Sequence, residues 1–324
     1  MTMQRRTFAA AMAAAGLQGL AGLAHAQAFP ARPVTLVVPY AAGGNGDLTA
    51  RLFAESFSKV LAQSVVVENR AGGGGAIGAT YVAGSRPDGY TLFVAAKGVF
   101  AITPNLVKVS YSMDNFKPVG FISRTPMVLV VKKGSKFKSL ENVIEAARKE
   151  PGRLAVGMGA MGSDNHVALM QLELAAKCSF NSVAYKGAAP MLQDILASQL
   201  DVGVDQLTTS KPFLESGDLI ALAVLGTSQE PSLPSVPTIA RIGAEPFDST
   251  TYIGLLAPRA TPEATVAILG SGLRKALEDP RLNAGFSKSG GSIYAGEPGE
   301  FESRVQRESD FIRKMIQDGK IQRE

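Results

Sequence analysis

The chain has 324 residues with a formal net charge of +5, and its lysines and arginines are scattered rather than clustered. A nucleic-acid-binding protein would show a clustered basic face, so we expect no nucleic-acid partner. One cysteine and two histidines exclude an internal disulfide and a zinc site of the usual histidine and cysteine type, so we expect no metal.

Residues 1–26 have the three-part pattern of an export signal. The pair Arg5-Arg6 precedes an apolar stretch of small residues, and AHA at 24–26 is a small-x-small cleavage site. The apolar stretch is too short for a membrane-spanning helix. Because RRTF at 5–8 also fits a twin-arginine signal loosely, the Sec and the twin-arginine export routes both stay open. We expect a mature chain that begins near Gln27 and lies in the periplasm.

Strands and helices alternate after the signal, which is typical of α/β folds with mostly parallel sheets. The runs LVV, VVV and LFVA are nearly continuous in apolar residues, as expected of strands that are buried on both faces. The first series predicts strands at 34–40, 64–69 and 90–96, and helices at 47–61 and 76–83.

A second series begins near residue 126 and predicts a second lobe. Its strands are expected at 126–135, 153–159, 181–187, 200–205 and 219–226, and its helices at 139–149, from the turn after 159 to about 177, and at 189–197. Two closing helices, at about 262–278 and 298–317, have few strands of their own, so we expect them to pack on the first lobe. The predicted fold is α/β with a hinge and a cleft between two lobes: 27–124 with 252–324 for lobe 1, and 125–251 for lobe 2.

Three turns that are poor in side chains, at 41–47, 159–165 and 186–189, each follow a predicted strand and precede a predicted helix. Ligands of open α/β sheets bind at the carboxyl ends of the strands, where such turns lie. The N-terminus of a helix offers unpaired amides and a partial positive charge, and it binds anions without charged side chains. Glycine turns are also ordinary connections, but three of them in a two-lobed chain favour an anion site between the lobes.

The glycines at 73–78 formally spell GxGxxG after a predicted strand. A dinucleotide site requires an acidic residue near the end of the next strand, which here ends in Ala95-Ala96-Lys97. We therefore expect no nucleotide cofactor.

Three charged residues near the turns have two interpretations each. Lys97 would pair with a second anionic group of a ligand, or it is a solvated lysine at a strand end. Asp205 would accept a hydrogen bond from a ligand or a bridging water, or it caps the turn that follows. We interpret Asp47 as the N-cap of the first helix rather than as a ligand contact.

Ser163 and His166 are the only pair that would suit a serine hydrolase, and the GxSxG motif is absent from the sequence. Ser163 is better explained as the N-cap of the helix that follows. We therefore expect a protein that is not an enzyme, with a periplasmic hydrolase as the less favoured alternative.

Six segments, in order, resemble the extracytoplasmic receptors of tripartite tricarboxylate transporters, the TctC or Bug-type solute-binding proteins. They are FPARPVTLVVPYAAGGNGD, VVVENRAGGGGAIGA, RPDGYTLFV, VAYKGAAPMLQDILASQLDVGVD, LPSVPTIARIG and YIGLLAPRATP. The resemblance covers essentially all of the mature chain.

The resemblance implies a type II periplasmic-binding-protein architecture that captures a small-molecule carboxylate without a cofactor and delivers it to integral-membrane transporter subunits. We expect a monomer, and the alternative is a ligand-loaded sensor that docks on a signalling receptor. The residues with implied or predicted binding roles are Tyr40, Ala41, Ala42, Gly43, Gly44, Asn45, Lys97, Ala160, Met161, Gly162, Ser163, His166, Lys186, Gly187, Ala188 and Asp205.

Two residues depart from the small polar residues that are usual for this family in the stretch AAKGVFAITPN. Lys97 would make the pocket wall more cationic, and Phe100 would make it more apolar. Both together predict a ligand with two carboxylates, or with one carboxylate and an aromatic body.

Overall fold

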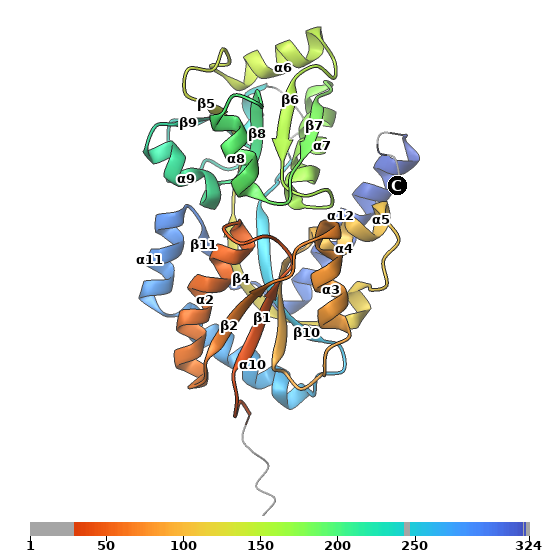
Figure 1. Ribbon diagram of the computed structural model, residues 1–324, viewed down its shortest axis with the longest axis vertical. Helices are drawn as coiled ribbons and strands as arrows, with labels where there is room; N and C mark the ends of the chain where they lie inside the picture. The colour runs from red at the N-terminus through yellow and green to blue at the C-terminus, as the bar shows by residue number, and fades with distance from the viewer. Residues whose placement is uncertain (1–28, 243–246, 320, 322–324) are drawn as a thin grey trace, which may run out of the picture.

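The computed structural model describes residues 29–242, 247–319 and 321, and its two α/β lobes are stacked along the long axis of the molecule (Figure 1). The predicted export signal at 1–26 lies outside the described residues. Each lobe contains one β-sheet that is flanked by helices, so the predicted two-lobed α/β fold is confirmed. Within the described residues, no helix has the length and apolar character needed to span a bilayer.

Lobe 1 is built on a six-stranded sheet with the order β11-β4-β10-β3-β1-β2. β1 pairs in parallel with β2 and β3, whereas β10 pairs antiparallel with β3 and β4. The strands are β1 (Val34–Val38), β2 (Val65–Asn69), β3 (Thr91–Ala96), β4 (Phe116–Thr125), β10 (Thr251–Pro258) and β11 (Ser292–Ile293). The helices are α2 (Asn45–Leu61), α3 (Ala76–Ala83), α4 (Gly98–Ala101), α5 (Thr103–Leu106), α10 (Glu263–Leu277), α11 (Pro280–Ser289) and α12 (Pro298–Gln317).

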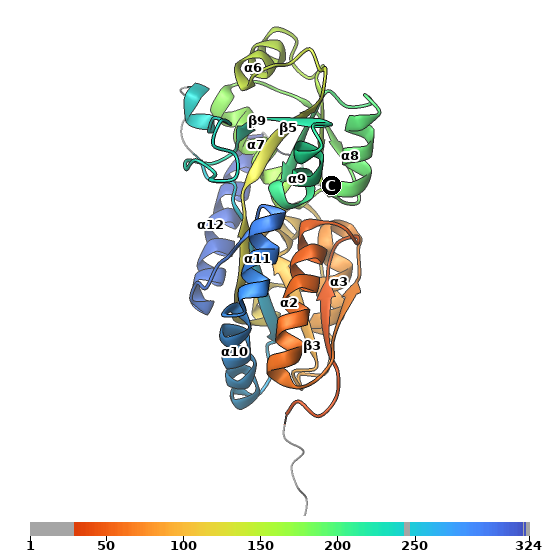
Figure 2. The ribbon, with the colours of Figure 1, turned by 90° about the vertical axis from the view of Figure 1, so that its left-hand side faces the viewer.

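The alternation of side chains along β1 separates the two layers of the lobe 1 core. Val34, Leu36 and Val38 pack with α2, α10 and α11 on one side of the sheet. Val37 packs with α3 and α12 on the other side. Because successive side chains of a strand point to opposite faces, a continuous apolar run is buried on both. Figure 2 shows α2 and α11 side by side on the first of these faces.

Lobe 2 is built on a five-stranded sheet with the order β7-β6-β8-β5-β9. Its two layers follow the same alternation: Val128 and Val130 pack with α8 and α9, and Leu129 and Val131 pack with α6 and α7. The strands are β5 (Met127–Lys132), β6 (Ala155–Met158), β7 (Asn181–Ala184), β8 (Val202–Gln206) and β9 (Leu219–Val224). The helices are α6 (Leu140–Lys149), α7 (Asp164–Ala176), α8 (Ala188–Leu196) and α9 (Leu207–Glu215).

Two strands that carry the chain between the lobes run against their neighbours. β4 ends at Thr125 and β5 begins at Met127, and after β9 the chain returns to begin β10 at Thr251. β5 is antiparallel to β8 and β9, and β10 is antiparallel to β3 and β4. The reason is that β5 and β10 start at the lobe boundary, where β3 and β8 end. β11 is also antiparallel to β4, so among the described strands only β1 with β2 and β3, and β6 with β7 and β8, pair in parallel, and the prediction of mostly parallel sheets is wrong.

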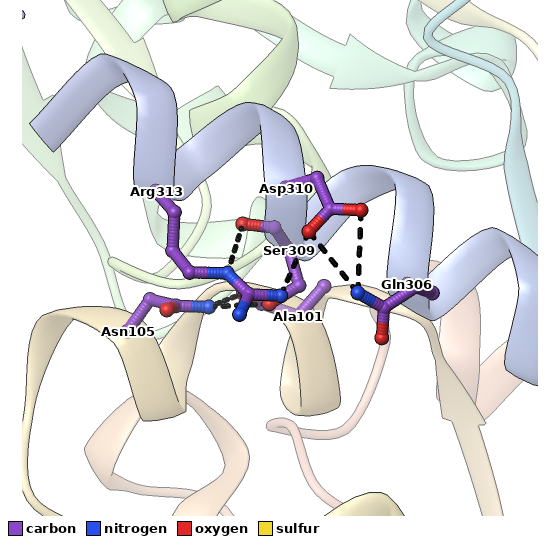
Figure 3. A network of polar contacts seen from close by, with 6 residues as sticks. All are labelled: Ala101, Asn105, Gln306, Ser309, Asp310 and Arg313. Atoms are coloured by element: carbon purple, nitrogen blue, oxygen red, sulfur yellow. Dashed lines mark hydrogen bonds and ion pairs between the residues drawn. The ribbon is translucent and has the colours of Figure 1, made fainter. Parts of the chain in front are cut away.

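The C-terminal helix α12 is part of lobe 1, where it packs on α4 and β4. Figure 3 shows polar contacts that hold it there: Asn105 Nδ2 donates to the carbonyl of Ala101 (2.6 Å) and to Ser309 Oγ of α12 (2.8 Å). Arg313 donates to the carbonyl of Ser309 and pairs with Asp310 within the helix. Glu308 of the same helix pairs with Lys97, the residue that follows β3.

Candidate ligand-binding site

Three helix N-termini meet at one cavity between the lobes. α2 follows β1 from lobe 1, and α7 and α8 follow β6 and β7 from lobe 2. The cavity has a volume of about 50 Å³. The cavity is lined by Tyr40, Ala41, Gly44, Asn45, Gly46, Val94, Ala95, Ala96, Gly159, Ala160, Ser163, Asp164, Asn165, Gly187, Ala188, Gln206, Thr251 and Ile253.

The first glycine turn directs the start of α2 at this cavity. Gly44 is the N-cap in an extended conformation, and no side chain caps the helix there. The amides of Asn45 and Gly46 belong to the first helical turn, so they have no partner within the helix. The amide of Gly43 is different, because it donates to Asp47 Oδ2 (2.9 Å) and is not free for a ligand.

Asp47 lies inside the helix and not at its N-cap, which corrects the prediction. Its carboxylate accepts from Gly43 and pairs with Arg51 (2.9 Å). Burial alone would raise the pKa of Asp47, but these hydrogen bonds hold it below its usual value. The residue fixes the turn and does not line the cavity.

The side chain of Asn45 connects the two lobes at the cavity. Its Oδ1 accepts from Thr125 Oγ1 at the end of β4 (3.2 Å) and from Thr208 Oγ1 of α9 (2.8 Å). Its Nδ2 is buried and has no partner among the described residues. Two hydroxyl donors fix the amide orientation, so the NH₂ group remains free to donate to a ligand. Thr208 was not predicted, because a threonine in an unassigned segment carries no motif.

The turn before α7 presents the second helix N-terminus. Ser163 occupies the predicted N-cap position, but its side chain makes no capping hydrogen bond, and its Oγ is buried without a partner. Asp164 is the first residue of the helix, and its Oδ1 accepts from the amide of Gly98 in lobe 1 (3.2 Å). A Cβ atom at Gly98 would lie 2.8 Å from that oxygen, so only glycine lets the two lobes approach here.

The structure brings half of the predicted binding residues to the cavity wall: Tyr40, Ala41, Gly44, Asn45, Ala160, Ser163, Gly187 and Ala188. The others lie outside the wall. Lys186, Ala42 and Gly43 are exposed, and Met161 and Gly162 contact Gly74 and Thr103 of lobe 1. The prediction missed Asp164, Asn165, Gln206 and Thr251, which are polar residues at strand or helix ends without a recognisable motif.

Lys97 and Phe100 do not line the cavity, which corrects the prediction that they form its wall. Lys97 Nζ pairs with Glu308 Oε2 of α12 (2.9 Å), and its side chain is only 12 % exposed. Phe100 is buried in the lobe 1 core, with its ring centroid 5.0 Å from that of Phe116 and 5.9 Å from that of Phe301. Neither residue therefore supplies the expected contact to a second carboxylate or to an aromatic body.

Asp205 bonds to hydroxyl groups of α9 and does not line the cavity, although it is not the N-cap of that helix, which is Gln206. Its Oδ2 accepts from Thr209 Oγ1 and from Ser210 Oγ, each at 2.6 Å. The side chain is fully buried, and burial raises the pKa of Asp205 to about 6. The residue stands behind the cavity wall rather than in it.

His166 is buried behind the α7 turn and is expected to make the fold sensitive to acid. Its Nδ1 accepts from the amide of Gly162 (3.4 Å), and burial lowers the pKa of His166 to about 4. The unfolded chain therefore binds one more proton than the folded chain between pH 4 and 6.5, so this stabilisation is present above pH 6.5 and is lost as the pH falls.

Between pH 7 and 5 the loss from His166 should be about 2 kcal/mol of unfolding free energy. Urea denaturation at both pH values measures it in the wild type and in His166→Gln, in which this acid-dependent loss should disappear. Asp205 acts in the opposite direction over this range, because its raised pKa favours the folded state at lower pH, but it is present in both proteins. Equal pH dependence in the two proteins would contradict the buried neutral imidazole.

Comparison with known proteins places this geometry in a family. The model of the tripartite tricarboxylate transporter family receptor matches residues 49–321. The chain belongs to this receptor family. Members of the TctC and Bug group are periplasmic solute-binding proteins, and the chain is accordingly a solute-binding protein and not an enzyme. The hydrolase alternative is thereby excluded.

Three solved structures of related receptors have the same fold. The periplasmic binding protein BugD is 30 % identical, with a TM-score of 0.85 over 91 % of this chain and 100 % of that one. MatC from Rhodopseudomonas palustris, with bound malate, is 31 % identical, with a TM-score of 0.83 over 89 % and 100 %. A second R. palustris protein, solved with adipate, is 34 % identical, with a TM-score of 0.83 over 89 % and 97 %.

Proposed function

We propose that this receptor captures a small organic carboxylate in the interlobe cavity by lobe closure and delivers it to membrane transporter subunits. The observation that carries the proposal is the convergence of the α2, α7 and α8 N-termini on one cavity. Their unpaired amides and partial positive charges provide a site for an anionic group without a cationic side chain.

Buried polar atoms without partners support a ligand at this place. Asn45 Nδ2, Ser163 Oγ and Thr251 Oγ1 are buried atoms of lining residues, and none has a partner among the described residues. A buried polar group without a hydrogen bond destabilises the fold by about 1–3 kcal/mol. A carboxylate would accept from all three groups and remove that penalty.

Contacts between the lobes support capture by closure. Thr208 donates to Asn45 beside the cavity. Figure 2 shows α9 of lobe 2 next to α11 of lobe 1, and here Lys211 of α9 donates to the carbonyl of Ser287 of α11 (3.1 Å). At the mouth, a Cβ atom on Gly187 would lie 3.5 Å from Ala41 Cβ. A ligand that contacts both lobes binds the closed form better than the open one and shifts the population toward it.

Two related proteins were solved with small carboxylates, MatC with malate and the second R. palustris protein with adipate, and these ligands support a small organic carboxylate here. The family, receptors of tripartite tricarboxylate transporters, supports delivery to transporter subunits, and such delivery requires export of the chain to the periplasm. A sensor that docks on a signalling receptor is the alternative. Ligand-dependent capture of the transporter subunits, rather than of a signalling receptor, would distinguish the two.

Thermal melts of the mature protein with mono-, di-, tricarboxylic and aromatic acids test carboxylate capture. An acid at 100 times its dissociation constant should stabilise the fold by about 2.7 kcal/mol. Ala41→Trp should abolish the shift, because the indole would fill the mouth against Gly187. Ala42→Trp is the matched control: Ala42 is the next residue but is exposed and does not line the cavity, so its shift should remain. A flat panel with protein that native mass spectrometry shows to be ligand-free would contradict the proposal.

A further inference from the structure

Asp164 gives the cavity a negative charge that a simple carboxylate site would not need. Among the described residues that line the cavity, Asp164 is the only one with a carboxylate, and no lysine or arginine lines it. Its side chain belongs to the first residue of α7, directly beside amides that would hold an anionic group. A second negative charge at this place would repel the ligand unless the ligand also brings a hydrogen-bond donor.

One oxygen of Asp164 is left without a partner. Oδ1 accepts from the amide of Gly98, but Oδ2 is buried and has no partner among the described residues. The residue is only 4 % exposed, so water at the surface does not satisfy this oxygen. A buried carboxylate oxygen in this state is stabilised strongly by an incoming hydroxyl or ammonium group.

The nearby cation does not neutralise Asp164. Lys97 forms its ion pair with Glu308, so it is the shared counter-charge of two buried carboxylates, Glu308 and Asp164. Burial alone would lower the pKa of Lys97, but the charges of Asp164 and Glu308 raise it, which keeps the lysine charged. Asp248, in the segment between β9 and β10, adds a further negative charge near the lysine. These four residues, Lys97, Asp164, Glu308 and Asp248, carry one positive and three negative formal charges, and only Asp164 among them lines the cavity.

Tyr40 faces the same charge from the first turn. It lines the cavity, and burial together with the negative charge of Asp164 raises the pKa of its phenol. Tyr40 is therefore neutral and adds no charge of its own, so the negative charge of Asp164 is the feature of the wall that a ligand has to match.

We infer that Asp164 is a specificity residue, and that the receptor selects carboxylic acids carrying a hydroxyl or ammonium donor on the carbon next to a carboxylate. The carboxylate lies on the helix N-termini, and the donor bonds to Asp164 Oδ2. The donor is expected close to the carboxylate because Asp164 is itself the first residue of α7. This inference rests on the proposed function and goes beyond it by naming the class of acid.

Matched acids test the inference by isothermal titration calorimetry on the mature protein. Succinate, malate and aspartate differ only in the group at one carbon, as do propionate, lactate and alanine. In at least one series the wild type should bind the acid with a donor about 10- to 100-fold more tightly than the acid without one, as expected for a hydrogen bond to a buried charge. Malate against aspartate, or lactate against alanine, shows whether the donor is a hydroxyl or an ammonium.

Asp164→Asn removes the charge and keeps an oxygen that can accept from Gly98. The preference for acids with a donor should fall at least fivefold, and the affinity for the matching acid without a donor should rise. Asp248→Asn is the matched control, because it removes a charge near Lys97 but does not line the cavity, and it should keep the wild-type preference. The melting temperature of each ligand-free variant shows whether it is folded.

Two results would overturn the inference. One is a wild type that binds succinate and propionate as tightly as their hydroxy and amino counterparts. The other is a folded Asp164→Asn protein that keeps the preference for acids with a donor, or that binds all acids more weakly by the same factor. Either result leaves carboxylate capture intact, whereas the absence of binding by any acid would contradict the proposed function itself.

Discussion

Asn45→Ala is expected to weaken binding of the best acid by a factor on the order of 100. The substitution removes the Nδ2 donor beside the cavity and the acceptor that Thr208 uses to join the lobes. A hydrogen bond to a charged group contributes about 1.5–3 kcal/mol and a neutral one about 1 kcal/mol, which together correspond to this loss. Isothermal titration calorimetry with the acid that gives the largest thermal shift measures it.

Thr208→Val separates the two contributions of Asn45. It removes only the hydrogen bond between the lobes and leaves the donor of Asn45 in place, so the affinity should fall only about fivefold. Asn45→Ala should also destabilise the ligand-free protein by about 1–3 kcal/mol, because it leaves the buried hydroxyl of Thr125 without its acceptor. A folded Asn45→Ala protein with nearly wild-type affinity would show that the main-chain amides alone bind the ligand.

Lys97→Met should lower the free energy of unfolding at pH 7 by about 3–5 kcal/mol, the loss typical of breaking a buried ion pair from one side. The substitution leaves Glu308 and Asp164 buried without the cation. Burial already raises the pKa of Glu308, and loss of the lysine raises it further. The folded variant then binds a proton more readily than the unfolded chain, so its stability falls as the pH rises and its deficit is smaller at pH 5 than at pH 7.

The double variant Lys97→Met/Glu308→Leu is the control for this ion pair. Replacing both partners with apolar residues of similar size removes the unpaired charge of Glu308 but leaves Asp164 without the lysine, so it should recover part of the lost stability. Urea denaturation at pH 7 and at pH 5 measures all three proteins. If the free energy of unfolding of Lys97→Met is within about 1 kcal/mol of the wild-type value at both pH values, the lysine is solvated, as in the simpler of its two interpretations.

Much of the fold is predictable because its signals are local. The apolar run of β1 and the glycines before α2 place a strand, a turn and a helix within a short stretch, and local preferences decide such elements. β4 was missed because Pro118 and Gly120 resemble strand breakers. The structure accommodates them where β10 shifts register, between Leu255 and Leu256 beside Pro118. α9 was missed in the same way, because Pro212 lies inside it.

The sequence by itself determined the alternation of strands and helices, the glycine turns and the family. Each depends on residues that are neighbours in the chain. Only the tertiary structure decided which polar groups face the cavity. Lys97 was expected to meet a ligand, but its partner is Glu308 on the C-terminal helix, and Asn45 depends on Thr208 from the other lobe. Contacts between distant segments depend on how the lobes pack, and no local pattern in the chain encodes them.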